Sequence, residues 1–250
     1  MIKVNNVSVE INKAILLKDI TCNILPGRFT AIIGKNGSGK TTLINCICNQ
    51  QKYSGSVQIY DTEVKALSYL ALSKKIAYLP QDLPCPAVTV EELVSFGRTP
   101  YIGLRNKLTR KDLDAIEAAL IQTDILSFSH RMLNTLSGGE RQKAFLAMIL
   151  AQNTDILILD EPNTYMDAAA EAEFFGLLKK LTKLGKTVIV VLHNLSLAVS
   201  CADDITILDR GQCVFSGSTE QCLAQQQIEK VFCVKRFDSF VGNKIEVFFK

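Results

Sequence analysis

The sequence predicts an α/β fold, in which a parallel sheet covered by helices is joined to a β-rich N-terminal layer and a helical insertion. The segments 155–160 and 187–191 are almost continuously apolar, as strands buried on both faces of a parallel sheet must be. A helical pattern over 168–184 lies between them, which is the order of a βαβ crossover. From Thr89 to about Leu150 the chain is mostly helical.

Length and composition exclude several classes of protein. The chain has 250 residues, of which 48% are hydrophobic and 21% charged, so it can bury a core and is not disordered. The net charge of +3 gives no reason to expect a nucleic-acid partner. No apolar run approaches the roughly 18–20 residues of a membrane span, and the first residues do not resemble a signal peptide. We therefore expect a cytosolic chain.

The eight cysteines and two histidines form no C-x-x-C pair and no cluster with metal-ligand spacing. In a cytosolic protein, cysteines of this kind are usually reduced and act as small apolar side chains. We expect the eight thiols to be reduced and to fill the core.

The N-terminal part is expected to be rich in strands. Residues 2–11 alternate apolar and polar side chains, and a second run ends at Pro26 and Gly27. The expected strands are 2–11, 15–25, 28–33, 55–60 and 76–79, with a helix over 41–48.

The composition changes after the segment 84–86, which contains two prolines. Helices are expected over 91–96, 111–123 and 139–152, and a hairpin joins 205–208 to 213–215 through the turn 209–211. We expect one domain over 1–250: an α/β core with an antiparallel β layer from 1–86 and 151–250, and a helical insertion from 87–150.

A glycine-rich loop between an expected strand and an expected helix carries the first chemical motif. Residues 34–41 fit the pattern G-x-x-x-x-G-K-[ST]. Glycines let backbone N–H groups turn toward phosphate oxygens, the helix presents its positive end, and the lysine neutralises phosphate charge. The candidate nucleotide-binding residues are Gly34, Asn36, Gly37, Ser38, Gly39, Lys40, Thr41 and Thr42. An ordinary glycine-rich turn is the alternative, which the flanking strand and helix disfavour.

Two acidic residues stand at the end of the expected strand 156–159. A carboxylate at the carboxyl end of a parallel strand lies where α/β sheets bind ligands. Asp160 is a candidate Mg²⁺ ligand together with the Thr41 hydroxyl, and Glu161 is the candidate base that orients or deprotonates the attacking water. A plain strand-to-loop exit is the alternative, and the phosphate loop makes it the weaker one.

A second anion site is predicted at residues 136–142, Leu-Ser-Gly-Gly-Glu-Arg-Gln. Ser137, Gly138 and Gly139 begin a helix and can present backbone N–H groups to an anion. One chain needs a second such site only if that site serves a partner's nucleotide. With this segment between the phosphate loop and Asp160, the chain resembles the ATP-binding subunit of an ABC transporter, and the P-loop NTPase fold of that family is expected.

The resemblance covers essentially all 250 residues and implies roles for three further residues. Gln81 matches the glutamine that senses Mg²⁺ and the permease, Asp167 the aspartate of the D-loop, and His193 the switch histidine at the γ-phosphate. The implied catalytic set is Glu161, His193 and Gln81, and the implied metal set is Thr41, Gln81 and Asp160.

Two short stretches indicate which members of the family the chain resembles. Residues 94–100 and 163–167 are similar to those of ATPases that serve iron–siderophore, haem and vitamin B12 importers, with zinc and manganese importers as neighbours. Tyr165 belongs to the second stretch. The chain departs from the family pattern at Ile11, where an aromatic residue usually stacks on adenine at roughly 1 kcal/mol, and at Asn163, which replaces threonine.

The resemblance also implies partners. We expect a head-to-tail homodimer in which two ATP molecules lie between the Lys40 loop of one copy and the Ser137 segment of the other. The dimer would power an integral membrane permease dimer at the cytoplasmic side of the inner (plasma) membrane, and act indirectly with a substrate-binding protein. The alternatives are a zinc or manganese importer ATPase, and a soluble ABC ATPase of iron–sulfur cluster assembly.

Overall fold

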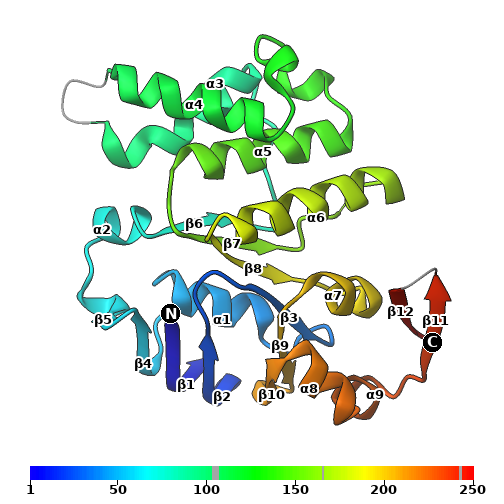
Figure 1. Cartoon of the computed structure of the whole chain (residues 1–250). Coiled ribbons are helices and arrows are strands. Elements are labelled where there is room, and N and C mark those ends of the chain that lie inside the picture. The colour runs from blue at the N-terminus through cyan, green and yellow to red at the C-terminus, as the bar shows by residue number, and fades with distance from the viewer. Residues whose placement is uncertain (103–106, 165, 242–243) are drawn as a thin grey trace. The chain divides into compact units, whose positions relative to one another are not determined.

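The structure is a computed structural model that describes residues 1–102, 107–164, 166–241 and 244–250. The chain forms two compact units (Figure 1). The first contains Met1–Ser68 and Thr182–Lys250, and the second contains Tyr69–Leu181. The helical insertion expected over 87–150 falls inside the second unit.

An antiparallel sheet forms one layer of the first unit. Its strands are β1 (Ile2–Ile11), β2 (Ala14–Ile24), β4 (Ser54–Ile59) and β5 (Thr62–Glu63), in the order β2-β1-β4-β5. Ile2 lies opposite Ile24 on one side and Ile59 on the other, and all three side chains are buried. The strands expected at 2–11, 15–25 and 55–60 are confirmed to within one residue at each end.

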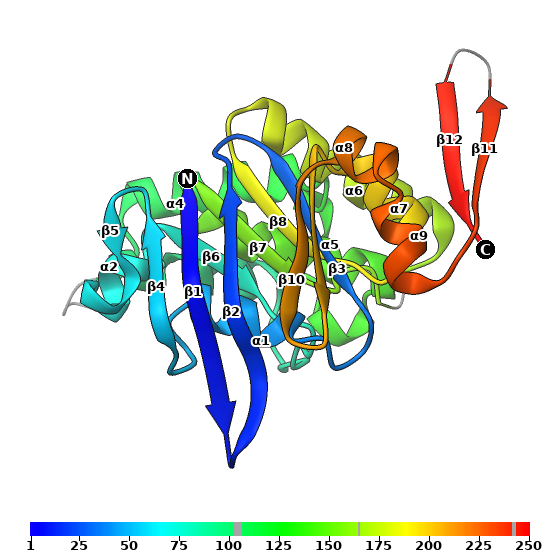
Figure 2. The ribbon, with the colours of Figure 1, turned by 90° about the horizontal axis from the view of Figure 1, so that it is seen from below.

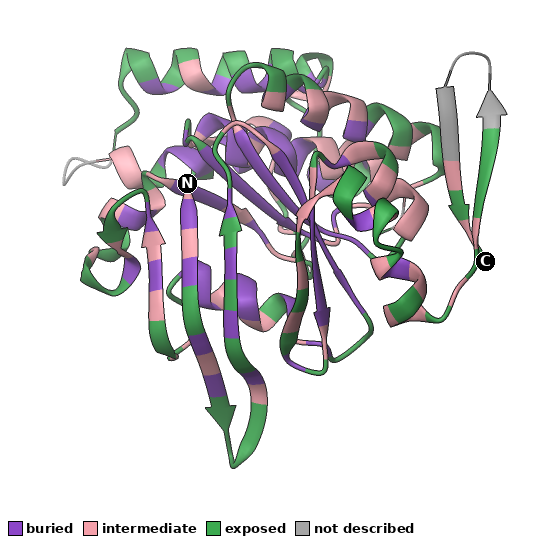
Figure 3. Ribbon diagram, turned by 60° about the horizontal axis from the view of Figure 1, so that its bottom comes forward, coloured by how far each residue is buried: buried purple, intermediate pink, exposed green. Residues whose placement is uncertain are grey.

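The second layer of this unit centres on a buried parallel strand. Strand β3 (Phe29–Gly34) pairs in parallel with β8 (Thr187–Val191) and β9 (Asp204–Asp209), and β10 (Gln212–Ser218) returns antiparallel to β9. Every residue of β3 and β8 is buried, as Figure 3 shows in purple. This confirms that both strands are covered on both faces.

The hairpin between β9 and β10 turns over two residues with positive φ, Arg210 at 47° and Gly211 at 76°. Positive φ at both positions is the type I′ turn that matches the twist of paired strands. The expected hairpin and its turn are confirmed.

The first unit also contains four α-helices and a C-terminal pair of antiparallel strands. They are α1 (Lys40–Ile47), α7 (Leu195–Cys201), α8 (Thr219–Ala224), α9 (Gln227–Phe232), β11 (Arg236–Val241) and β12 (Lys244–Phe249). Figure 2 shows β11 and β12 beside α7 and α9. Of these helices and strands, only α1 was expected from the sequence.

The second unit is mostly helical. Strands β6 (Ile76–Leu79) and β7 (Ile156–Asp160) pair in parallel, with Ile76 opposite Ile156. The helices are α2 (Tyr69–Ser73), α3 (Val90–Ser95), α4 (Arg110–Gln122), α5 (Gly138–Ala151) and α6 (Ala168–Lys183), with a 3₁₀ helix at Phe96–Tyr101. The helices α3, α4, α5 and α6 were expected to within one residue at each end, and α2 was missed.

The helices α3, α4 and α5 each begin with a capping box. Thr89, Thr109 and Ser137 accept a hydrogen bond from the backbone of the residue three positions later, whose carboxylate bonds back. Such reciprocal bonds satisfy backbone donors that a helix leaves open at its start. The starts of these helices are therefore set by local sequence.

The cysteines differ in burial, and Cys201 and Cys213 are half-buried. All eight are free, and Cys22, Cys46, Cys48 and Cys222 are buried. Cys85 and Cys233 are exposed, so the expectation that all eight thiols fill the core is wrong for these two. Cys85 lies in the loop after β6 and Cys233 after α9, where a small side chain has no core to fill.

Within the described residues, no helix has both the length and the apolar character needed to cross a membrane.

A buried ion pair holds three elements of the second unit together. The Arg98 Nε atom lies 2.8 Å from Asp112 Oδ1, and an Arg98 NH group donates to the carbonyl of Ala151 at 2.7 Å. Asp112 also accepts from the hydroxyl and backbone of Thr109, and these bonds, together with Arg98, lower the pKa of its carboxyl. Arg98 thereby joins the 3₁₀ helix to the start of α4 and the end of α5.

We expect Arg98→Ala to lower the free energy of unfolding by about 3 kcal/mol, because removing one member of a buried pair leaves the other charge uncompensated. Arg110→Ala is the matched control, because the Arg110–Asp114 pair lies on α4, the helix of Asp112, and its side chains are 83% and 56% exposed. That control should change stability by at most about 0.5 kcal/mol. Urea unfolding followed by circular dichroism measures both, and equal midpoints for the two variants would contradict the role of Arg98.

Candidate functional site

The loop between β3 and α1 in the first unit has the geometry of an anion cradle. Gly37 and Gly39 adopt φ of 75° and 99°, and Ser38 N–H donates to the Lys35 carbonyl at 3.1 Å. Helix α1 begins directly after the loop, and its first turn contains no acidic side chain. The positive end of the helix therefore has no carboxylate of its own and favours an anion.

Two side chains of the loop are buried, although they are polar. Ser38 is 3% exposed and its Oγ atom has no hydrogen-bond partner, while Lys40 is 6% exposed. The Lys40 ammonium donates to the backbone carbonyls of Gly34 at 2.9 Å and Lys35 at 3.3 Å. A buried hydroxyl without a partner costs free energy, and a phosphate oxygen would offset that cost. The loop thus fits a phosphate group.

The remaining loop candidates lie at its surface. Asn36, Gly37 and Thr41 are exposed, Gly39 and Thr42 are half-buried, and Thr41 is in the first turn of α1. The Thr41 hydroxyl is thus placed where an oxygen ligand could reach a cation bound with phosphates.

The turn of the β9–β10 hairpin contacts the phosphate loop through its backbone, and this contact was not expected from the sequence. The Gly211 N–H donates to the Ser38 carbonyl at 3.1 Å, and the Gly211 carbonyl accepts from Lys18 N–H of β2 at 2.8 Å. A Cβ atom at Gly34 would lie 2.4 Å from the carbonyl oxygen of Leu208 on β9, so only glycine fits there. The glycine pattern was the one sign in the sequence that another backbone comes close to the phosphate loop, and the pattern could not indicate which strand that backbone belongs to.

His193 lies in the same unit, after the carboxyl end of β8. Strand β8 is the parallel neighbour of β3, and Leu192 N–H donates to the Ile32 carbonyl at 3.1 Å. The carboxyl ends of parallel neighbours share one edge of the sheet, so His193 and the phosphate loop leave the sheet at the same edge. His193 is exposed there.

Ile11 lies at the end of β1, paired with Ala14 of β2 in the hairpin, and is 39% exposed. Further along β2, a Cβ atom at Gly39 would meet Leu17 Cδ2 at 2.5 Å, so β2 runs beside the phosphate loop. The hairpin therefore offers aliphatic side chains and no aromatic ring at the position of Ile11.

The second unit brings three candidates together. Asp160 is the last residue of β7 and is 1% exposed, and Glu161 follows it with a positive φ of 49°. Gln81, after the neighbouring strand β6, donates from Nε2 to Glu161 Oε2 at 2.8 Å. A positive φ in a residue other than glycine is a strained conformation that recurs at functional sites. The two residues expected to act on the water and the metal are thus adjacent to each other.

The start of α5 presents Ser137, Gly138 and Gly139. The Ser137 hydroxyl and backbone N–H donate to Glu140 Oε2 at 2.7 Å and 2.8 Å, and these two bonds lower the pKa of the Glu140 carboxyl. The Ser137 hydroxyl also accepts from the Glu140 backbone N–H at 3.3 Å. A Cβ atom at Gly139 would lie 3.0 Å from the Ala170 methyl of α6. The serine hydroxyl is therefore held by its own helix cap.

The segment before α6 contains two further candidates. Asp167 caps this helix by accepting from Ala170 N–H at 2.8 Å, and the Asn163 amide donates to Glu171 at 3.3 Å. Asn163 thus has a structural partner on α6. Tyr165, used above to narrow the resemblance, lies outside the described residues.

The protein-family model of the ABC transporter domain matches residues 17–164, which is more than half of the chain. This range runs from β2 to the segment after β7 and includes the phosphate loop, Ser137, Asp160 and Glu161.

Relatives extend the match to nearly the whole chain. The petrobactin import ATP-binding protein FpuC of Bacillus anthracis is 34% identical over 98% of this chain and 90% of its own length. The manganese transport system ATP-binding protein MntB of Listeria innocua is 35% identical over 90% of this chain and 93% of its own. The dimeric structure of the ATP-binding cassette MJ0796 with ADP and Pi matches with a TM-score of 0.74 at 29% identity, over 88% of this chain and 99% of that chain. On these matches, the chain is an ATPase that belongs to the ABC transporter family.

Proposed function

We propose that this chain hydrolyses ATP to power the import of a metal chelate of the iron–siderophore, haem or cobalamin type. The phosphate loop, with its buried Ser38 hydroxyl and Lys40 ammonium, is the observation that carries the ATP chemistry. The cargo class rests on the relatives, because the import protein at 34% identity over 98% of this chain serves petrobactin. The resemblance of 94–100 to siderophore and vitamin B12 ATPases supports the same class.

The loop residues bind the phosphates in this proposal. Lys40 exchanges its bonds to the Gly34 and Lys35 carbonyls for phosphate oxygens, while the N–H groups of the loop and the first turn of α1 complete the cradle. Gly34, Asn36, Gly37, Gly39 and Thr42 shape this backbone. Ile11 provides an apolar contact for the adenine.

The metal in this proposal is Mg²⁺. Thr41, Gln81 and Asp160 offer a hydroxyl, an amide and a carboxylate oxygen, which are the hard ligands that Mg²⁺ prefers. Mg²⁺ supplies charge neutralisation at the phosphates when it is bound. No cluster of three or more His, Cys, Asp or Glu that could hold a metal occurs among the described residues.

Glu161, Gln81 and His193 carry the chemical step. Glu161 accepts the proton of the attacking water, and the Gln81 amide orients the Glu161 carboxylate through the bond from Nε2 to Oε2. His193 donates a hydrogen bond to the γ-phosphate from the sheet edge where the phosphate loop also begins.

Two copies act head to tail, with the Ser137–Gly139 segment and Asp167 of one copy facing the phosphate loop of the other. The start of α5 supplies N–H groups to the partner's γ-phosphate, so the interface is stable only when phosphate is present. The dimer binds a membrane permease dimer at the cytoplasmic face of the plasma membrane, and the permease receives solute from a substrate-binding protein. Manganese is the second candidate cargo, because the manganese transport relative is 35% identical over 90% of the chain.

Affinity purification of the tagged chain from detergent-solubilised membranes of its host tests the transport role. We expect a polytopic permease to be retained, and the permease's family to distinguish a metal chelate from manganese as the cargo. A soluble partner of iron–sulfur cluster assembly, with no membrane protein retained, would contradict the transport role while leaving the ATP chemistry unchanged.

We expect Glu161→Gln to reduce ATP turnover by about 10²–10⁴-fold, because an amide cannot accept the proton of the attacking water. ATP binding should persist, since the phosphate loop is unchanged. Turnover and binding are measured on the assembled complex, with Glu117→Gln on the exposed face of α4 as the control of equal chemistry. Parent turnover in the Glu161 variant would exclude Glu161 as the base.

We expect Lys40→Ala to weaken binding of a fluorescent ATP analogue by about 10–100-fold, the equivalent of one or two lost charge-assisted hydrogen bonds. Lys35→Ala is the control, because Lys35 belongs to the same loop but its side chain is exposed. A titration with Mg²⁺ present measures both affinities. If the two variants lost affinity equally, Lys40 would act only as one more positive charge.

A further inference from the structure

Three stretches of backbone from distant parts of the sequence meet at one glycine of the first unit. The Gly211 N–H donates to the Ser38 carbonyl of the phosphate loop at 3.1 Å, and the Gly211 carbonyl accepts from the Lys18 N–H of β2 at 2.8 Å. We propose that Gly211 is a positioning residue for the ATPase reaction, which sets the affinity of the phosphate loop for nucleotide through the loop backbone. The proposal rests on the proposed role of this loop in binding phosphate.

The position of Gly211 leaves no space for a side chain. A Cβ atom there would lie 2.7 Å from the Leu16 carbonyl oxygen and 3.5 Å from Leu17 Cα, both of which belong to the backbone of β2. A backbone oxygen cannot rotate aside as the end of a flexible side chain can. Any other residue at this position therefore pushes the turn and β2 apart, and the turn can no longer bond to β2 and to the phosphate loop together.

The phosphate loop itself touches the same part of β2. A Cβ atom at Gly39 would lie 2.5 Å from Leu17 Cδ2 and 3.0 Å from the Leu16 carbonyl oxygen. The loop, β2 and the turn before β10 thus contact one another in pairs, and the bond from Gly211 to Ser38 is the third contact. Figure 2 shows β2 and β10 side by side. A displacement of the turn consequently reaches the loop both directly and through β2.

The bond to Ser38 fixes the direction of the next N–H group of the loop. The peptide bond between Ser38 and Gly39 is trans, so its carbonyl and its N–H point in opposite directions. While Gly211 holds the carbonyl, the Gly39 N–H points away from the turn, at the start of α1. Rotation of this peptide takes one N–H donor from the phosphate. The loss of one hydrogen bond to a charged group corresponds to about tenfold or more in affinity.

The first test is Gly211→Ala. We expect KM for ATP, measured on the assembled complex, to rise about tenfold while kcat stays within about twofold, because Glu161 and Gln81 belong to the second unit and keep their bond. Affinity of the full chain for a fluorescent ATP analogue with Mg²⁺ should fall by the same factor. Inorganic tripolyphosphate, which has neither base nor ribose, should show the same loss as a competitor, because the change is at the phosphates.

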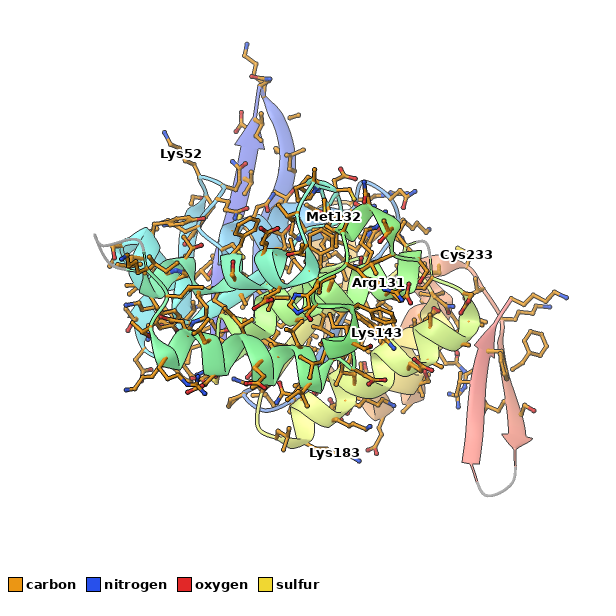
Figure 4. All side chains as sticks on the ribbon, turned by 90° about the horizontal axis from the view of Figure 1, so that it is seen from above. Lys52, Arg131, Met132, Lys143, Lys183 and Cys233 are labelled. Atoms are coloured by element: carbon orange, nitrogen blue, oxygen red, sulfur yellow. The ribbon has the colours of Figure 1, made fainter. Side chains whose placement is uncertain are left out.

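Gly185→Ala is the matched control. Gly185 has a φ of 90°, close to the 76° of Gly211, but a Cβ atom there would meet no atom within 4 Å. It lies in the exposed turn after α6, two residues beyond Lys183, whose side chain extends outward in Figure 4. Alanine at positive φ costs stability at both positions. We therefore expect both variants to melt at a lower temperature and only Gly211→Ala to change KM.

Lys18→Pro tests the junction without adding an atom to the turn, and it decides the matter if Gly211→Ala does not fold. Strand β2 is at the edge of its sheet, where proline is tolerated, and the Lys18 N–H points to Gly211 and not to β1. We expect the affinity for the ATP analogue to fall about threefold, as for the loss of one neutral hydrogen bond. Lys18→Ala keeps the N–H and should bind as the parent does.

Four results would overturn the positioning role. They are parent KM in a folded Gly211→Ala variant, equal changes of KM in the Gly211 and Gly185 variants, a loss of affinity for the analogue without a loss for tripolyphosphate, and parent affinity in Lys18→Pro. In all four, the parent chain still binds nucleotide, so the phosphate-loop assignment stands. A parent chain that bound neither the analogue nor tripolyphosphate would instead overturn that assignment, and the positioning role with it.

Discussion

The parallel pairing of β3 with β8 and β9 is the interaction on which the nucleotide site of the first unit depends. These hydrogen bonds fix the point at which β3 ends, so the phosphate loop begins at the same edge of the sheet as the segment with His193. Every residue of β3 is buried, and its register therefore cannot shift without exposing apolar side chains or breaking buried hydrogen bonds. A flexible glycine loop becomes a defined anion cradle because its origin cannot move.

The cradle is made mainly of backbone, and backbone also supports it from behind. A Cβ atom at Gly34 would lie 2.4 Å from the Leu208 carbonyl oxygen, and one at Gly211 would lie 2.7 Å from the Leu16 carbonyl oxygen, so neither position has room for a side chain. Phosphate binding by backbone N–H groups orders no additional side chains and so costs no side-chain entropy, but the shape of the loop depends on the neighbouring strands.

In the second unit, several residues that the resemblance places at the nucleotide already have hydrogen-bond partners. Gln81 bonds to Glu161, and Ser137 is engaged by Glu140 in the cap of α5. The strained backbone of Glu161 persists because β7 and the segment after it hold this residue in place. For Ser137, contact with a partner's phosphate would compete with a local bond whose net worth is about 1 kcal/mol, so the segment stays ordered before a partner arrives.

The sequence by itself determined the α/β class, the strands and helices next to the phosphate loop, Ser137 and Asp160, and the ATPase family. Local rules suffice there: the glycine pattern at 34–41, the capping residue Ser137, and apolar runs such as 187–191 each act within a few positions of the chain. The tertiary structure alone decided which backbone contacts the phosphate loop and that Gln81 meets Glu161 across eighty positions of sequence. Those contacts depend on strand order and register, because residues far apart in sequence meet only through the pairing and packing of the strands that carry them.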